Sequence, residues 1–158
     1  MMKDTKLAFL YETIDALGYR VEFGNVAGDR DGETIHEKKL VRIQWDLTVR
    51  PYRSTVGHEC AHVVFRDHPS RFGPVNAKQE RRADEWAARQ LITVDEYRAA
   101  EARHEGHIEA MAIELLVTVD IVQAFQRVLL RIGDAVYIDP RMGAGQAEAR
   151  IDLSLEGV

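Results

Sequence analysis

The chain contains an H-E-x-x-H motif at residues 58–62, and this motif can do chemistry. On a helix, His58 and His62 lie one turn apart on the same face, so both imidazoles can bind one metal ion. Zn²⁺ binds neutral imidazole readily and, in catalytic sites, keeps a position for water, whose pKa it lowers toward about 7. The motif therefore predicts two zinc ligands, with Glu59 beside them as the base that takes the proton of that water.

The residues around the motif favour a buried helix. Thr48 is a fair N-cap, Pro51 is tolerated in a first turn, and the helix is expected to run to about Phe65. The apolar stripe expected to bury this helix consists of Val56, Cys60, Val63 and Val64. Such packing leaves the histidines at the edge of a cleft. The alternative is a surface helix on which two histidines are one turn apart by chance.

A catalytic zinc site usually has three protein ligands, and the sequence offers two candidates for the third. His68 stands ten residues after His58, as in the pattern H-E-x-x-H-x-x-G-x-x-H. That pattern needs a glycine where this chain has Phe65, so His68 is expected on the following loop. Glu80 is the preferred candidate.

Glu80 opens a second predicted helix, on which Glu80 and Asp84 share the face of Ala83, Ala87 and Leu91. Buried carboxylates need a cation or a hydrogen-bond donor opposite them. Glu80 as third ligand meets that need, with Asp84 accepting the other ring N–H of a ligand histidine. The small alanines allow close approach to the first helix.

The alternative for these two carboxylates is simple ion pairing with arginines such as Arg50 or Arg53.

Two motifs together carry a family resemblance: H-E-x-x-H at residues 58–62 and E-x-x-A-D-x-[aromatic]-A-x-x-x-L at residues 80–91. In this combination the chain resembles the ImmA/IrrE family of small bacterial and phage metallopeptidases. The resemblance implies a zincin-like domain and a protein substrate. Similar proteins act as phage and mobile-element antirepressors that cleave a helix-turn-helix repressor, often under host stress signals.

Composition narrows the class of protein. With 158 residues, 46% of them hydrophobic, the chain can form one domain with a single core. Its net charge of −5 gives no electrostatic attraction to nucleic acid or an anionic membrane, and neither a membrane span nor a signal peptide is expected. Cys60 is the only cysteine, which excludes an intramolecular disulfide and favours a cytoplasmic location. We expect Cys60 to be a core residue.

The remaining patterns predict an α+β fold, with a small antiparallel sheet packed on the active-site helix plus further helices. Residues 5–17 have helical periodicity, and residues 19–23, 34–36 and 41–45 alternate as strands do. Residues 40–45 are expected to be an edge strand that binds extended substrate, with an ordinary core strand as the alternative. Residues 66–76 read as a loop. The Glu80 helix should end near Thr93, which can cap another helix.

Residues 1–130 are predicted to form the domain, with helix-turn-helix-like spacing at 107–129 and a tail at 131–158. The would-be recognition segment has no basic residue before Arg127, so these helices are expected to be structural. Hydrolysis also needs a hydrogen-bond donor for the developing oxyanion, and the candidates are Tyr97, His104 and His107.

The sequence thus predicts a zinc-dependent endopeptidase in which His58, His62 and Glu80 hold the ion and Glu59 is the general base. The competing hypothesis is a catalytically silent zincin-fold regulatory module that binds DNA or a repressor protein.

Overall fold

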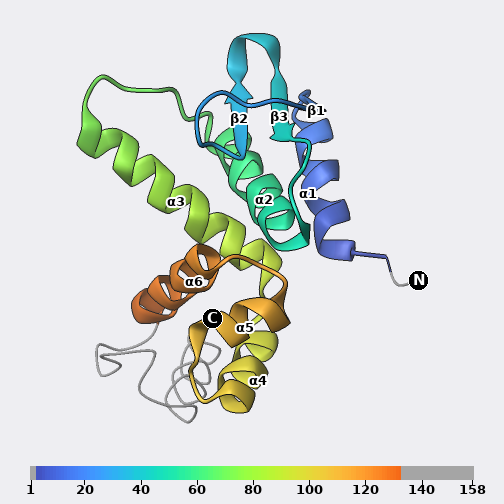
Figure 1. Cartoon of the computed structure of the whole chain (residues 1–158). Helices are drawn as coiled ribbons and strands as arrows, with labels where there is room; N and C mark the ends of the chain where they lie inside the picture. Colours follow the sequence, from blue (N-terminus) through green and yellow to red (C-terminus); the bar gives the residue numbers. More distant parts are fainter. Residues whose placement is uncertain (1–2, 133–158) are drawn as a thin grey trace.

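The computed structural model describes residues 3–132, and in this range the chain is an α+β structure with a small sheet at one end (Figure 1). The predicted tail lies almost wholly outside the described residues. In chain order the elements are α1 (Thr5–Ala16), β1 (Arg20–Gly24), β2 (Gly32–Ile35), a short 3₁₀ turn (His36–Lys38), β3 (Leu40–Gln44), α2 (Val49–Phe65), α3 (Gly73–Leu91), α4 (Val94–His104), α5 (Ile108–Leu115) and α6 (Val119–Ile132).

The three strands are ordered β1-β3-β2, and the sheet is mixed. β3 pairs parallel with β1 and antiparallel with β2, so the expectation of an antiparallel sheet is wrong for one pair. The segment between β1 and β2 does not form a hairpin, and this leaves the central position to β3. The expectation that residues 40–45 form an edge strand is therefore wrong as well. Leu40, Val41 and Ile43 are buried, as a central strand requires.

The boundaries of α2 agree with those predicted from the sequence. Thr48 is the N-cap, and Arg66 ends the helix in the left-handed conformation, with a φ of 54°. The loop after α2 is shorter than predicted, because α3 begins at Gly73 and takes Pro74 into its first turn, where proline is tolerated. Thr93 caps α4 as expected.

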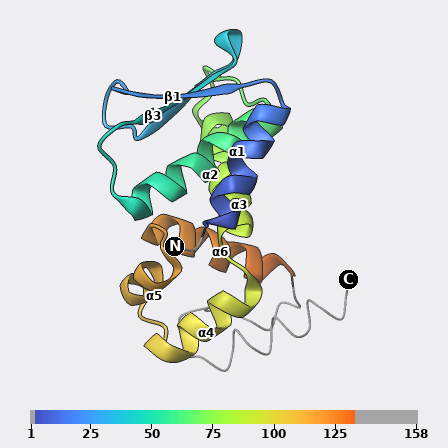
Figure 2. The same ribbon diagram turned by 90° about the vertical axis from the view of Figure 1, so that its right-hand side faces the viewer.

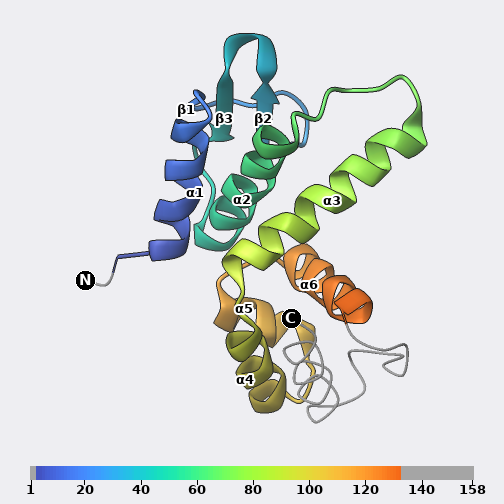
Figure 3. The same cartoon turned by 180° about the vertical axis from the view of Figure 1, so that it is seen from behind.

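Helices α2 and α3 pack at very short range. A Cβ atom placed on Gly57 would lie 2.9 Å from Cβ of Ala87 and 3.2 Å from Cδ1 of Leu91. Glycine facing alanine thus allows the two backbones to approach closely, as expected from the small residues of α3. Figure 3 shows α3 crossing α2, with α6 beside α3 on the far side.

The last three helices pack at the end of the molecule opposite the sheet (Figure 2). Arg53 of α2 is buried and connects the residue before α1 with the end of α5. Its guanidinium binds the carboxylate of Asp4 at 2.7 Å and donates to the carbonyl oxygens of Leu115 and Leu116. Leu116 has a φ of 56° and forms the turn between α5 and α6, so the helix-turn-helix spacing does produce two helices joined by a short turn.

Within residues 3–132, the helices are all too short or too polar to cross a lipid bilayer.

Gly57→Val should lower the free energy of unfolding by about 2 kcal/mol or more, because the new methyl groups overlap Ala87 and Leu91 at the tightest point between α2 and α3. Urea denaturation measures this loss. The matched control is Gly24→Val in β1, where a Cβ meets only Cδ of Arg42 at 3.8 Å. Equal stability of the two variants would contradict the close-packing account.

Candidate metal centre

Three donor side chains converge where α2 faces α3. The Nε2 atoms of His58 and His62 are 3.0 Å apart. One carboxylate oxygen of Glu80 lies 3.0 Å from Nε2 of His58, and the other lies 3.1 Å from Nε2 of His62. One donor atom from each side chain can be chosen so that all three lie within 4.8 Å of one another. Two imidazole nitrogens and one carboxylate form a ligand set known from catalytic zinc sites, so these residues fit such an ion.

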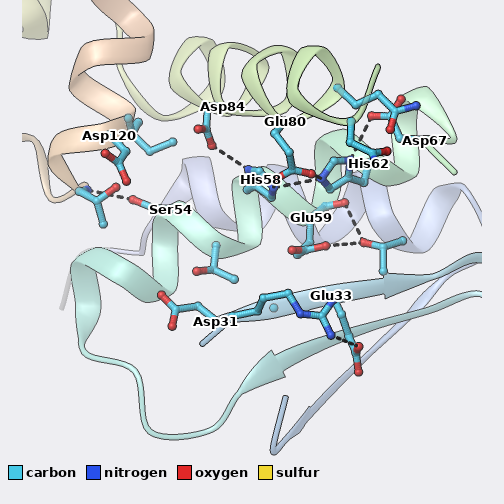
Figure 4. A pocket seen from close by; sticks show the side chains of 18 of the residues that line it. Asp31, Glu33, Ser54, His58, Glu59, His62, Asp67, Glu80, Asp84 and Asp120 are labelled. Atoms are coloured by element: carbon cyan, nitrogen blue, oxygen red, sulfur yellow. Dashed lines mark hydrogen bonds and ion pairs between the residues drawn. The ribbon is translucent and has the colours of Figure 1, made fainter. Parts of the chain in front are cut away.

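The other ring nitrogen of each histidine binds a carboxylate, which aims Nε2 at the common centre (Figure 4). Nδ1 of His58 is 2.7 Å from Oδ1 of Asp84, the partner predicted from the sequence. Nδ1 of His62 is 3.0 Å from Oδ2 of Asp67. Carboxylates placed in this way fix the tautomer and the orientation of ligand imidazoles.

These contacts shift the pKa values of the three donors. Burial lowers the pKa of His58, but hydrogen bonds to Asp84 and Glu80 outweigh burial and raise the pKa to about 10. Burial and the charge of His58 lower the pKa of His62, but the hydrogen bonds with Glu80 and Asp67 and the charge of Glu59 outweigh them and raise it. Hydrogen bonds from both histidines hold the pKa of Glu80 far below its usual range. The cluster therefore stabilises positive charge at the centre.

The donors open into a cleft of about 460 Å³ whose walls come from α2, α3, the start of α6 and strand β2. Glu59 lines this cleft but is only 5% exposed. Its Oε2 accepts a hydrogen bond of 2.6 Å from the hydroxyl of Thr34 on β2. A Cβ atom on Gly32 would lie 2.9 Å from Cγ of Glu59, so β2 passes directly over this carboxylate.

Comparison with protein families agrees with this geometry. The family model of the M78 peptidases, described as the IrrE N-terminal-like domain, matches residues 14–125. The chain belongs to the M78 peptidase family. The resemblance inferred from the two motifs is thereby confirmed, and so is the α+β fold. No curated protein matches the chain.

Sequence reasoning missed Asp67, which it placed only in the loop after α2. The side chain of Asp67 is 4% exposed and binds Arg82 of α3 as well as His62. The Asp67 carbonyl oxygen is also 2.7 Å from Nε2 of His36, on the sheet side. An aspartate directly after the left-handed Arg66 lies where the chain turns back over the helix end. The only indication in the sequence was that Asp67 follows shortly after Phe65, the predicted end of the helix.

The structure separates His68 from the metal centre. Its side chain is exposed, and its ring packs against the ring of His36 with centroids 4.6 Å apart. The arginine alternative for Glu80 and Asp84 also fails for Arg53, which binds Asp4 instead. Cys60 is fully buried, as expected of a core residue, and burial raises the pKa of its thiol to about 12.

The three oxyanion-donor candidates do not line the cleft, so this expectation needs correction. Tyr97 is fully buried among the C-terminal helices, where its hydroxyl accepts a hydrogen bond from Gln126. His104 interacts with Glu114, and exposed His107 is the N-cap of α5. All three belong to the α4–α6 end of the molecule and not to the cleft. Their positions along the sequence did not show this separation from the metal ligands.

Glu80→Ala should weaken zinc binding by about 100-fold or more, because it removes one of three ligands. His68→Ala is the matched control and should leave zinc affinity unchanged. Competition with a chromogenic chelator measures both variants. A larger loss in the His68 variant would contradict the assignment of Glu80.

Zinc binding at pH 7 should release protons, because His58 with a pKa of about 10 is protonated in the metal-free protein and zinc binds neutral imidazole. Apparent affinity should therefore rise about tenfold per pH unit for each proton released, from pH 6 toward pH 9. Calorimetry in two buffers of different ionisation enthalpy counts these protons. A zinc affinity independent of pH would show that the histidines are already neutral.

Proposed function

We propose that the protein is a zinc-dependent endopeptidase. The observation that carries this proposal is the position of Glu59, a buried carboxylate in the same cleft as the His58, His62 and Glu80 cluster. A metal site that served only the fold would need no further carboxylate beside its ligands and no open cleft. Membership in a peptidase family supports the same conclusion.

In this mechanism the bound zinc supplies Lewis acidity, which polarises a peptide carbonyl and lowers the pKa of water toward about 7. Glu59 accepts the proton of the attacking water and then passes it to the leaving amine. The hydroxyl of Thr34 donates to Oε2 of Glu59 and so holds the carboxylate in place, which leaves Oε1 for the proton. Asp84 and Asp67 keep the two imidazoles oriented.

Strand β2 is the best-placed element to bind the substrate backbone. It is an edge strand that pairs only with β3 in the described sheet, and Gly32, Glu33 and Thr34 line the cleft. An extended peptide can add to such an edge through main-chain hydrogen bonds. This assigns to β2 the role expected from the sequence for residues 40–45.

The proposed substrate is a helix-turn-helix repressor in the cytoplasm, as in the phage and mobile-element antirepressors that the chain resembles. The competing proposal, a silent module that binds DNA, rests on the α5-turn-α6 arrangement. Its support is weak, because Asp120 lies in the first turn of α6 and the first basic residue of that helix is Arg127.

Glu59→Gln should lower the rate of cleavage of a repressor that the wild type cuts by at least about 100-fold, because glutamine cannot accept the proton. Zinc content and thermal unfolding should remain close to wild type. The matched control is Glu12→Gln on the exposed face of α1, which should cleave normally. An active Glu59→Gln variant would overturn the peptidase mechanism, and DNA binding that survives chelation of zinc would support the silent module.

A further inference from the structure

We infer that His36 is a positioning residue for the metal ligand His62 and that it acts through Asp67, which lies between the two histidines. The hydroxyl of Tyr19 holds the ring of His36 in turn. This inference rests on the proposed function, because it concerns the same zinc site, and it assigns a part in that site to residues of the sheet end.

Asp67 is held by all four of its polar atoms. Its backbone N–H donates to the carbonyl oxygen of His62 at 3.2 Å, and its own carbonyl oxygen is 2.7 Å from Nε2 of His36. Its two carboxylate oxygens bind Nδ1 of His62 and the guanidinium of Arg82 (Figure 4). The planar peptide groups on both sides of its Cα are therefore fixed, and they set the direction in which the carboxylate leaves the chain.

Three parts of the fold meet at Asp67. His62 belongs to α2 and Arg82 to α3, whereas His36 begins the 3₁₀ turn that follows β2. Asp67 itself lies in the loop after the left-handed Arg66, outside any helix or strand, and it exposes only 9% of its surface. A buried carbonyl group that loses its donor pays the cost of desolvation until the backbone turns to find another. Such a turn would move the carboxylate away from His62.

The two partners of His36 define the orientation of its ring. A carbonyl oxygen only accepts hydrogen bonds, so Nε2 carries a proton and donates it to Asp67. In the neutral ring Nδ1 is then an acceptor, and the hydroxyl of Tyr19 donates to it at 2.7 Å. The ring of Tyr19 also meets the imidazole edge to face, with centroids 5.8 Å apart. These contacts hold the N–H of His36 toward Asp67.

The segment that carries His36 also holds the proposed general base. Thr34, two residues earlier, donates to Oε2 of Glu59 at 2.6 Å. Residues 34–36 thus contact the base directly and, through Asp67, orient a metal ligand. A single short segment at the end of β2 therefore supports both halves of the proposed chemistry.

A double-mutant cycle separates positioning from a merely structural role. If His36 acts through the carboxylate of Asp67, its effect on zinc affinity disappears once that carboxylate is removed. If His36 only stabilises the fold, its loss has the same effect whether or not the carboxylate is present. The two explanations therefore differ in the coupling between the two residues, and not only in the effect of one variant.

The test is zinc affinity, measured by competition with a chromogenic chelator. His36→Leu should weaken zinc binding by about tenfold, whereas His36→Gln, which keeps an N–H donor close to the position of Nε2, should stay within about threefold of wild type. Asp67→Ala should weaken binding by about tenfold or more, and His36→Leu added to it should cost less than about twofold further. His107→Leu, an exposed histidine at the N-cap of α5, is the matched control and should bind zinc as wild type does.

The cobalt(II) form supplies a second readout, because its visible absorption reports the geometry of the ligands. His36→Leu should change this spectrum, and His36→Gln should restore it. Wild-type affinity in folded His36→Leu, an equal loss with and without the Asp67 carboxylate, or no rescue by glutamine would overturn the inference.

Tyr19→Phe replaces His36→Leu in the cycle if the leucine variant does not fold. It removes only the hydroxyl on Nδ1 and should weaken zinc binding by about threefold, again only while Asp67 keeps its carboxylate. A Tyr19→Phe variant with wild-type affinity would then overturn the inference.

None of these readouts depends on cleavage. A wild type that binds zinc, shows this coupling and cleaves no peptide would refute the peptidase and keep the role of His36. A wild type that binds no zinc would overturn both.

Discussion

The proposed metal centre depends on the close packing of α2 against α3. The histidines are on one helix and Glu80 is on the other, so their distances are set by how near the two backbones can come. Gly57 against Ala87 permits that approach, and no larger pair would fit without moving the helices apart. Leu91, on the same face of α3, is buried against α2 beside Gly57.

The same packing gives partners to the buried carboxylate of Asp67 and to the half-buried carboxylate of Asp84. Asp84 and Asp67 each face an imidazole, and Asp67 also binds Arg82, so every charge near the centre has an opposite charge or a donor beside it. The same arrangement holds the imidazoles rigidly, which is what a catalytic ligand set requires.

Much of the site could be predicted from the sequence because it depends on helical periodicity. His58, His62, Glu80 and Asp84 were each placed by spacing along a helix, and the structure brings them together. Contacts that depend on chain topology could not be predicted. The parallel pairing of β1 with β3 gave β2 the edge position, and the end of α2 folded Asp67 back onto His62. Neither arrangement produces a repeating pattern of residues in the sequence. The buried position of Tyr97 is likewise decided by how α4 packs on α6.

X-ray absorption at the zinc edge tests the central claim most directly, because it reports the atoms around the ion. One zinc per chain should show two imidazoles and only nitrogen or oxygen neighbours, at about 2.0 to 2.2 Å, consistent with a carboxylate and a water as the other ligands. A sulfur neighbour at about 2.3 Å, or three imidazoles, would contradict the ligand set His58, His62 and Glu80.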